Sequence, residues 1–126
     1  MSDNIFDSSA IINCIKAGKA DKLLGQYTIE LTKFEIGNYI WKRRSGLTEE
    51  ECLKILRSIL VLIESMNLLQ VNFEEVMMIA LKENITFYDA SYLQAAIQYK
   101  LKLVTDDLKL YGVACKYVKS LRSLNL

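Results

Sequence analysis

The stretch NIFDSSAIINCI, residues 4–15, contains the change of pattern on which the fold prediction depends. A short apolar run ends on a carboxylate at Asp7, and apolar residues at helical spacing follow it directly. This order predicts a buried strand, an acid at its carboxyl end, and a helix. The segment LKLVTDDLKL, residues 101–110, has the same pattern near the other end of the chain, where Asp106 and Asp107 follow the apolar run.

Between these two segments, short apolar runs alternate with longer helical patterns. Strands are expected at residues 4–7, 26–31, 68–71, 101–105 and 113–118. Helices or helical turns are expected at residues 8–15, 19–24, 32–44, 48–66, 72–83, 86–97 and 119–124. This alternation predicts an α/β fold with a mostly parallel central sheet and helices on both faces.

Length and composition agree with one folded unit. The chain has 126 residues, 52% of them hydrophobic, and a formal net charge of +1, so we expect a single domain over residues 1–126. No apolar run is long enough to span a membrane, and the acidic start MSDNIFD does not resemble a secretory signal. We therefore expect a cytoplasmic protein.

The absence of one residue type limits the possible chemistry. The chain contains no histidine, and its three cysteines form no CxxC motif. Ser-His-Asp and Cys-His catalysis, histidine-based ribonuclease mechanisms and histidine-ligated zinc are therefore excluded. An enzyme with this sequence must use carboxylates, hydroxyls or lysines, with or without a hard metal ion.

Four acids are expected to meet at one edge of the sheet. Asp7 and Asp107 follow predicted strands, whereas Glu35 and Asp89 lie one turn into predicted helices. In parallel sheets, ligands bind beyond the carboxyl ends of the strands. Grouped carboxylates raise one another's pKa, which a divalent cation reverses, and an all-oxygen ligand set suits Mg²⁺ or Mn²⁺.

Each acid also has a purely structural interpretation as a helix cap. The candidates are an N-cap at Asp7, capping boxes at Thr32–Glu35 and Thr86–Asp89, and an N-cap at Asp106 or Asp107. Taken one at a time, these structural interpretations are favoured over the functional one. The argument for a site therefore depends on all four acids occurring together.

At these acids the chain resembles a known family. FDSSAI, LTKFEIGNYIW, TFYDASYLQAA and LKLVTDDLKL look like the four acidic motifs of PIN domains, in order, and the resemblance runs from Asn4 to Val118. The overall organisation looks like the toxin of VapBC toxin–antitoxin pairs. The resemblance implies a Mg²⁺- or Mn²⁺-dependent endoribonuclease that hydrolyses RNA with metal-activated water. It also implies an antitoxin partner and a homodimer.

The resemblance implies specific roles for the acids. Asp7 and Asp89 would be direct metal ligands, and Glu35 and Asp107 would complete the site or hold a water molecule beside the ion. The family's last motif reads T-x-D, which falls on Thr105 and Asp107 here.

Three neighbouring residues receive supporting roles from the same resemblance. Asp106 occupies the variable position of the last motif, so it would be a bystander or a substitute ligand. Ser8 and Thr32 match small hydroxyl positions that would orient the acids as hydrogen-bond donors.

Two surface features indicate partners. Residues 98–126 carry six basic residues against two acids, and Lys42-Arg43-Arg44 adds a basic cluster, which would suit RNA phosphates. Cations at helix C-termini and on a solvated face would explain them equally well. The broad apolar face of residues 47–66 could bind an antitoxin or could simply be core.

Two other functions remain open at this stage. The same fold could serve as a non-catalytic RNA- or protein-binding module, although such a module has no need for all four acids. A response-regulator-like receiver is disfavoured because the predicted strand LLQVNF ends without an acceptor aspartate.

Overall fold

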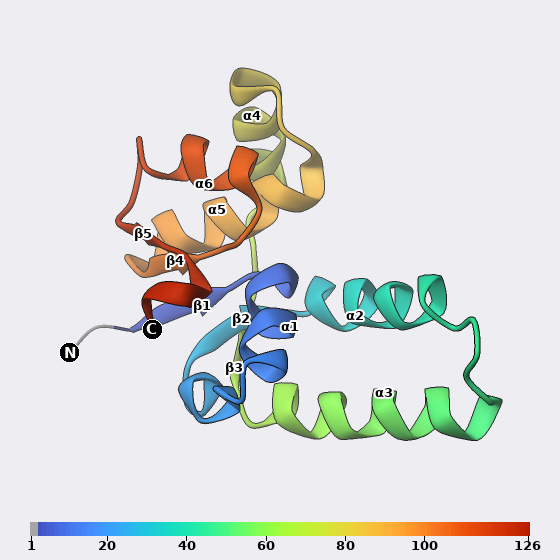
Figure 1. Ribbon diagram of the computed structural model, residues 1–126. Coiled ribbons are helices and arrows are strands. Elements are labelled where there is room, and N and C mark those ends of the chain that lie inside the picture. Colours follow the sequence, from blue (N-terminus) through green and yellow to red (C-terminus); the bar gives the residue numbers. More distant parts are fainter. Residues whose placement is uncertain (1–2) are drawn as a thin grey trace.

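The computed structural model, which describes residues 3–126, contains a five-stranded sheet with helices on both faces (Figure 1). The strands are β1 (Asn4–Phe6), β2 (Tyr27–Ile29), β3 (Asn67–Leu69), β4 (Lys102–Val104) and β5 (Ser120–Leu121). Their order is β3-β2-β1-β4-β5, and every neighbouring pair is parallel. The expected α/β fold with a mostly parallel sheet is confirmed.

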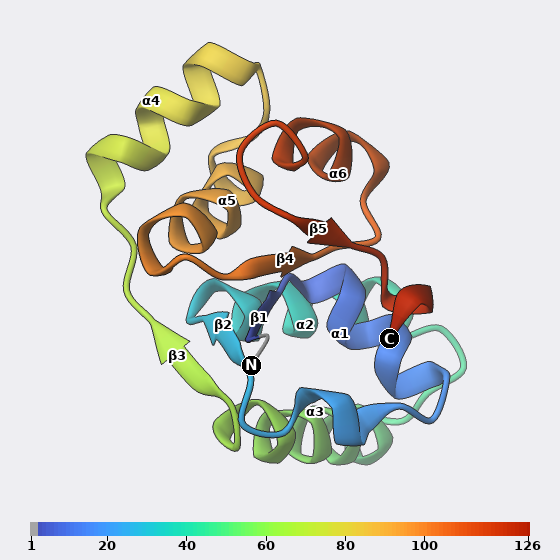
Figure 2. The same cartoon turned by 90° about the vertical axis from the view of Figure 1, so that its left-hand side faces the viewer.

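The helices divide into two layers, one on each face of the sheet, as both views show (Figure 1 and Figure 2). One layer contains α1 (Ser8–Lys16), the 3₁₀ turn η1 (Ala20–Leu23), α2 (Leu31–Lys42) and α3 (Glu49–Glu64). The other contains α4 (Phe73–Glu83), α5 (Phe87–Tyr99) and α6 (Leu108–Ala114). A last 3₁₀ turn, η2 (Ser123–Asn125), lies against α1.

Alternation along the central strands supplies a core to each layer. In β1, Ile5 belongs to the cluster with α4, α5 and α6, whereas Phe6 belongs to the cluster with α1, α2 and α3. In β4, Leu103 and Val104 divide in the same way. Neighbouring residues of a strand point to opposite faces, so short apolar runs build both cores.

Two predicted strands differ from the structure. The segment 113–118 was expected to be an edge strand, but α6 extends to Ala114 and the last strand is Ser120–Leu121. Leu110 and Ala114, four residues apart, are both buried, which is helical periodicity. The strand expected at 68–71 is β3, which is exposed rather than buried because it pairs only with β2.

Helix caps agree with the sequence at most positions. Thr48 and Glu51 form the full capping box at the start of α3, and Asn72 and Thr86 cap α4 and α5. The capping box expected at Thr32 is wrong, because α2 already begins at Leu31. None of the described helices is both long enough and apolar enough to cross a membrane.

The strand order places one crevice at the centre of the sheet. From β1 the chain moves outward through β2 and β3, then returns to the other side of β1 for β4 and β5. In open α/β sheets, ligands bind where the order reverses, beyond the carboxyl ends of the strands. Asp7 directly follows β1 and Thr105 directly follows β4, and the backbone N–H of Asp7 donates to Val104 at 3.1 Å.

Candidate active site

Asp7 is a buried carboxylate, 4% exposed, at the start of α1. Its Oδ1 accepts hydrogen bonds from the backbone N–H of Ala10 at 2.9 Å and from the Ser9 hydroxyl at 2.7 Å. Its Oδ2 accepts from the hydroxyl of Thr105. Burial raises the pKa of Asp7 to about 6, although these hydrogen bonds act to lower it. Asp7 is thus both the N-cap of α1 and a carboxylate with an unusually strong affinity for protons.

Asp89 lies in the first turn of α5, where its backbone N–H donates to Thr86 Oγ1 at 3.1 Å. Burial raises the pKa of Asp89 to about 6, and the negative charges of Asp107 and Glu35 add to this effect. Asp89 in turn contributes to the raised pKa of Asp7. The four acids named from the sequence therefore influence one another electrostatically.

Glu35 is held by a chain of buried hydroxyls. Tyr92 donates to Glu35 Oε1 at 2.6 Å, and the same phenol oxygen lies 2.7 Å from Thr32 Oγ1. Thr32 is 2.7 Å from Thr28 Oγ1, which donates to the carbonyl of Phe6 at 2.8 Å. Tyr92, Thr32 and Thr28 are each at most 1% exposed. This chain connects the side chain of Glu35 to the end of β1.

Asp107 is exposed and caps α6, where its Oδ1 accepts from the backbone N–H of Leu110 at 2.9 Å. Its own N–H donates to Thr105 Oγ1 at 3.1 Å. Thr105 therefore bridges the backbone of Asp107 and the carboxylate of Asp7. Because these contacts connect the ends of β1 and β4, the hydroxyl of Thr105 fixes the two strand ends relative to each other.

Asp106 is directed to the C-terminal segment. Its carboxylate accepts from Asn13 Nδ2 at 2.7 Å, Arg122 Nε at 3.2 Å and the backbone N–H of Ser123 at 2.8 Å. Burial acts to raise the pKa of Asp106, but the hydrogen bonds from Ser123, Asn13 and Arg122 outweigh it, and the pKa is lowered. These contacts hold η2 against α1.

The structure also contains polar contacts that the sequence did not suggest. The hydroxyl that donates to Asp7 belongs to Ser9, and no hydrogen bond joins Ser8 to an acid within residues 3–126. Tyr92 and Thr28 were missed entirely. Tyr92 follows Asp89 by three residues, a spacing that places both on one helix face. Thr28 is a hydroxyl inside an apolar strand, and such a group needs a buried partner.

The donor set is compatible with a hard cation, although no preformed cluster is present. Within residues 3–126, no three acidic, cysteine or histidine side chains are grouped closely enough to hold a metal ion. Mg²⁺ commonly uses only one or two carboxylates, with waters and substrate oxygens as its other ligands. Asp7 and Asp89 have raised pKa values that a nearby cation would lower. The chemistry of these oxygens therefore fits Mg²⁺ or Mn²⁺.

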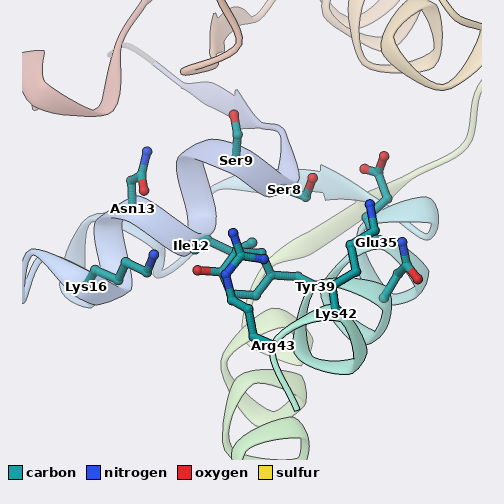
Figure 3. A pocket seen from close by; sticks show the side chains of 10 residues that line it. Ser8, Ser9, Ile12, Asn13, Lys16, Glu35, Tyr39, Lys42 and Arg43 are labelled. Atoms are coloured by element: carbon teal, nitrogen blue, oxygen red, sulfur yellow. The ribbon is translucent and has the colours of Figure 1, made fainter. Parts of the chain in front are cut away.

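A pocket of about 400 Å³ opens beside these acids, between α1 and α2 (Figure 3). Ser9 and Glu35 line it near the acids, and Lys16, Tyr39 and Arg43 line it farther along the two helices. Of the four acids, Glu35 lines this pocket directly, and Ser9, which donates to Asp7, lines it as well.

Comparison with known proteins assigns the family. No protein-family model matches the chain. Ribonuclease VapC3 of Pyrobaculum aerophilum is 30% identical over 121 residues, which cover 84% of this chain and 90% of that protein. The chain belongs to the VapC family of PIN-domain toxins. A second VapC relative from the same organism, Exonuclease VapC9, is 35% identical over 88 residues, or 65% of this chain and 62% of that protein.

Solved structures have the same VapC fold. The crystal structure of PAE2754 from Pyrobaculum aerophilum has a TM-score of 0.79 and 29% identity, covering 95% of this chain and 90% of its own. FitAcB from Neisseria gonorrhoeae has a TM-score of 0.68 and VapBC-1 from nontypeable Haemophilus influenzae 0.63, each at 16% identity. They cover 98% and 96% of this chain, and 99% and 98% of their own, respectively. The PIN-type fold inferred from the four acidic motifs is confirmed.

Proposed function

We propose that this VapC-family chain is a Mg²⁺- or Mn²⁺-dependent endoribonuclease and the toxin of a toxin–antitoxin pair. The observation that carries the proposal is the electrostatic interaction of Asp7, which follows β1, with Asp89 in the first turn of α5, in a chain 30% identical to a protein named as a ribonuclease. Carboxylates at a strand-order reversal, beside a pocket lined with cations, suit an anionic phosphodiester.

The four acids would have different roles, which depend on their surroundings. Asp7 and Asp89, whose pKa values are both raised to about 6, would hold the cation directly. Glu35, fixed by Tyr92, and Asp107, fixed as a helix cap, would complete the site or hold a water molecule beside the ion. Thr105 and Ser9 would orient the carboxylate of Asp7 through their hydrogen bonds.

The proposed reaction is hydrolysis of an RNA phosphodiester. The oxygen of a water molecule forms a new bond to phosphorus, the bond from phosphorus to one ribose oxygen breaks, and that oxygen takes up a proton. A divalent cation, when bound, would lower the pKa of water and neutralise negative charge on the phosphoryl oxygens. The chain itself contributes the orientation of the acids, which is set by buried hydrogen bonds.

The test is cleavage of single-stranded RNA by the purified protein with Mn²⁺, with Mg²⁺ and with EDTA. Asp7→Ala and Asp89→Ala should each abolish cleavage, whereas Asp21→Ala, which removes an exposed acid from η1, should leave it unchanged. Thermal unfolding should show that all three variants are folded. Cleavage at the wild-type rate by both site variants would overturn the assignment of the acids. Failure of the wild type to cleave RNA would overturn the ribonuclease proposal and favour the non-catalytic binding module.

The two named relatives differ in the type of cut, since one is called a ribonuclease and the other an exonuclease. A circular single-stranded RNA distinguishes the two modes because it has no ends. An endonuclease linearises the circle, so we expect a single linear product early in the reaction. Digestion of linear RNA alone would show that the enzyme acts from the ends.

An antitoxin partner would bind the outer surface of α2 and α3. Trp41, Leu53 and Val61 are exposed by 59%, 38% and 70%, and Ile63 is the buried residue of α3, so this helix is not simply core. We propose that an apolar antitoxin segment covers this surface. If a short gene encoding a candidate antitoxin lies next to this one, its product should co-purify with the wild-type chain. Co-purification should be lost in Leu53→Glu, and equal co-purification with both proteins would contradict the proposal. An RNA substrate would also place the protein in the cytoplasm.

A further inference from the structure

Three cationic residues from two helices, Lys16, Lys42 and Arg43, line the pocket of Figure 3. Lys16 lies in the last turn of α1, and Arg43 is the C-cap of α2. Neither forms an ion pair with a carboxylate among residues 3–126. The helix dipole favours a cation at each helix end separately, but it does not require the two to converge.

The ring of Tyr39 holds both cations in place. The guanidinium carbon of Arg43 is 3.7 Å from the centre of this ring, and Lys16 Nζ is 5.2 Å from it. Both distances fall within the range of cation–π attraction. Lys16, Lys42 and Arg43 place positive charges around one pocket, which favours binding of an anion there. In Figure 3 the side chain of Lys16 extends toward Arg43 and Tyr39.

On the basis of the ribonuclease function proposed above, we infer that this cationic pair binds the RNA phosphate next to the one that is cut. One pocket joins the two places: Glu35 and Ser9 line it, and Ser9 donates to Asp7. A strand that crosses the acids therefore continues directly to Lys16 and Arg43. The volume of about 400 Å³ lies within the range of about 300–1,000 Å³ typical of ligand pockets.

The other residues of the pocket favour a nucleotide over a simple anion. Asn38 and Ser8 contribute an amide and a hydroxyl to this pocket, whereas Asn13 and Ser9 already donate to Asp106 and Asp7. Such groups match the hydroxyls of ribose and the edges of a base in single-stranded RNA. The pocket thus contains uncharged polar groups as well as cations.

Arg44 provides a matched control for Arg43. It also stacks on an aromatic ring, with its guanidinium carbon 4.1 Å from the centre of Trp41, but it lines a different and smaller cavity. Arg43→Ala and Arg44→Ala change the net charge equally, so a general electrostatic effect would alter both equally. Lys22→Ala serves the same purpose for Lys16, because Lys22 is exposed on η1 and lies outside this pocket.

The primary measurement is the affinity for a fluorescent single-stranded RNA in EDTA, by anisotropy, at several salt concentrations. Binding without metal separates this inference from catalysis. Arg43→Ala and Lys16→Ala should each weaken binding by about fivefold and reduce the salt slope by about 0.7, the value for one lost contact to single-stranded phosphate. Arg44→Ala and Lys22→Ala should stay within about twofold of wild type.

Tyr39 is tested by a conservative pair. Tyr39→Phe keeps the ring and should bind RNA like wild type, whereas Tyr39→Leu removes the cation–π support and should weaken binding by about threefold. Equal effects of the two substitutions would show that the ring does not organise the cations, and would overturn this part of the inference.

Neutral methylphosphonate linkages locate the contacted phosphate. Neutralising the linkage adjacent to the cut should weaken binding to wild type but not to the Lys16→Ala/Arg43→Ala double variant. If the pocket variants bind RNA like wild type, the subsite is overturned while the ribonuclease proposal stands. If the pocket variants bind RNA weakly but the wild type cleaves no RNA, the subsite stands and the ribonuclease proposal is overturned. A wild type that binds no RNA overturns both.

Discussion

Tyr92 illustrates how one buried residue determines the position of a proposed catalytic acid. Its hydroxyl donates to Glu35 and also contacts Thr32, and the side chain is 1% exposed. Burial and the charge of Glu35 raise the pKa of Tyr92 well above its ordinary value, so the hydroxyl keeps its proton at neutral pH. Tyr92 is therefore a positioning residue that acts through Glu35.

Tyr92→Phe should lower the cleavage rate without unfolding the protein. The substitution keeps the buried ring but removes the donor to a charged acceptor, and we expect a loss of about tenfold in kcat. The KM for RNA should change little, because Glu35 is displaced rather than removed. Tyr88→Phe on the same helix is the control, since Tyr88 is 59% exposed. Equal rates in both variants would refute the positioning role.

The raised pKa of Asp7 makes stability depend on pH in a defined direction. An ordinary aspartate has a pKa of 3.8, whereas that of Asp7 is about 6 in the fold, so the folded state binds the proton more tightly. This contribution stabilises the fold below about pH 4 and is lost as the pH rises through about 6. We therefore compare the free energies of unfolding of Asp7→Asn and wild type without metal. As the pH rises from about 4.5 to about 7.5, the difference should change in favour of Asp7→Asn by on the order of 2–3 kcal/mol.

Urea unfolding in EDTA at both pH values measures this difference directly. Added Mn²⁺ at neutral pH should stabilise wild type but not Asp7→Asn, because the ion would replace the proton on the carboxylate. A stability difference that does not vary with pH would show that Asp7 has an ordinary pKa. Equal stabilisation of both proteins by Mn²⁺ would argue against Asp7 as a metal ligand.

At the scale of elements, Asp106 joins the C-terminal turn η2 to α1. Asp106→Asn keeps the size of the side chain but removes its charge and one acceptor oxygen, so Asn13, Arg122 and Ser123 lose part of their bonding. We expect a loss of about 1–3 kcal/mol in the free energy of unfolding. Cleavage well below the melting temperature should be unchanged. Loss of cleavage in a folded variant would place Asp106 in the active site instead.

The elements best predicted from sequence are those with local signals. The capping box at Thr48 and the caps at Asn72 and Thr86 lie within the segments they stabilise, so neighbouring residues reveal them. The strand at Ser120–Leu121 had no such signal. Its two residues are in a sheet only because β4 lies beside them, and pairing between distant segments leaves little trace in local sequence.

At the scale of the whole molecule, a second apolar surface lies near the edge of the sheet that β3 forms. Phe34, Phe73 and Tyr88 are exposed by 74%, 69% and 59%, and they line one cavity of about 490 Å³. Monomeric proteins rarely leave large apolar patches uncovered. We propose that a second copy of the chain covers this patch and that the resulting dimer is the homodimer expected from the sequence.

Phe73→Glu should convert this dimer to a monomer, because it places a charge in the proposed interface. Light scattering after size-exclusion chromatography measures the mass directly. Val61→Glu on α3, which is 70% exposed, is the control and should leave the dimer intact. A wild type that is monomeric at all concentrations, or a dimer that persists in Phe73→Glu, would remove this surface from consideration.

The sequence alone was sufficient for the alternation of strands and helices and for the placement of Asp7 and Asp107 after parallel strands. Those features depend on local periodicity and on the rule that parallel strands end together. Only the tertiary structure decided that Ser9 rather than Ser8 donates to Asp7, that Tyr92 holds Glu35, and that Asp106 is directed away to the C-terminal segment. The physical reason is that a hydrogen bond requires atoms about 3 Å apart, and that precision comes from the packing of both helical layers on the sheet.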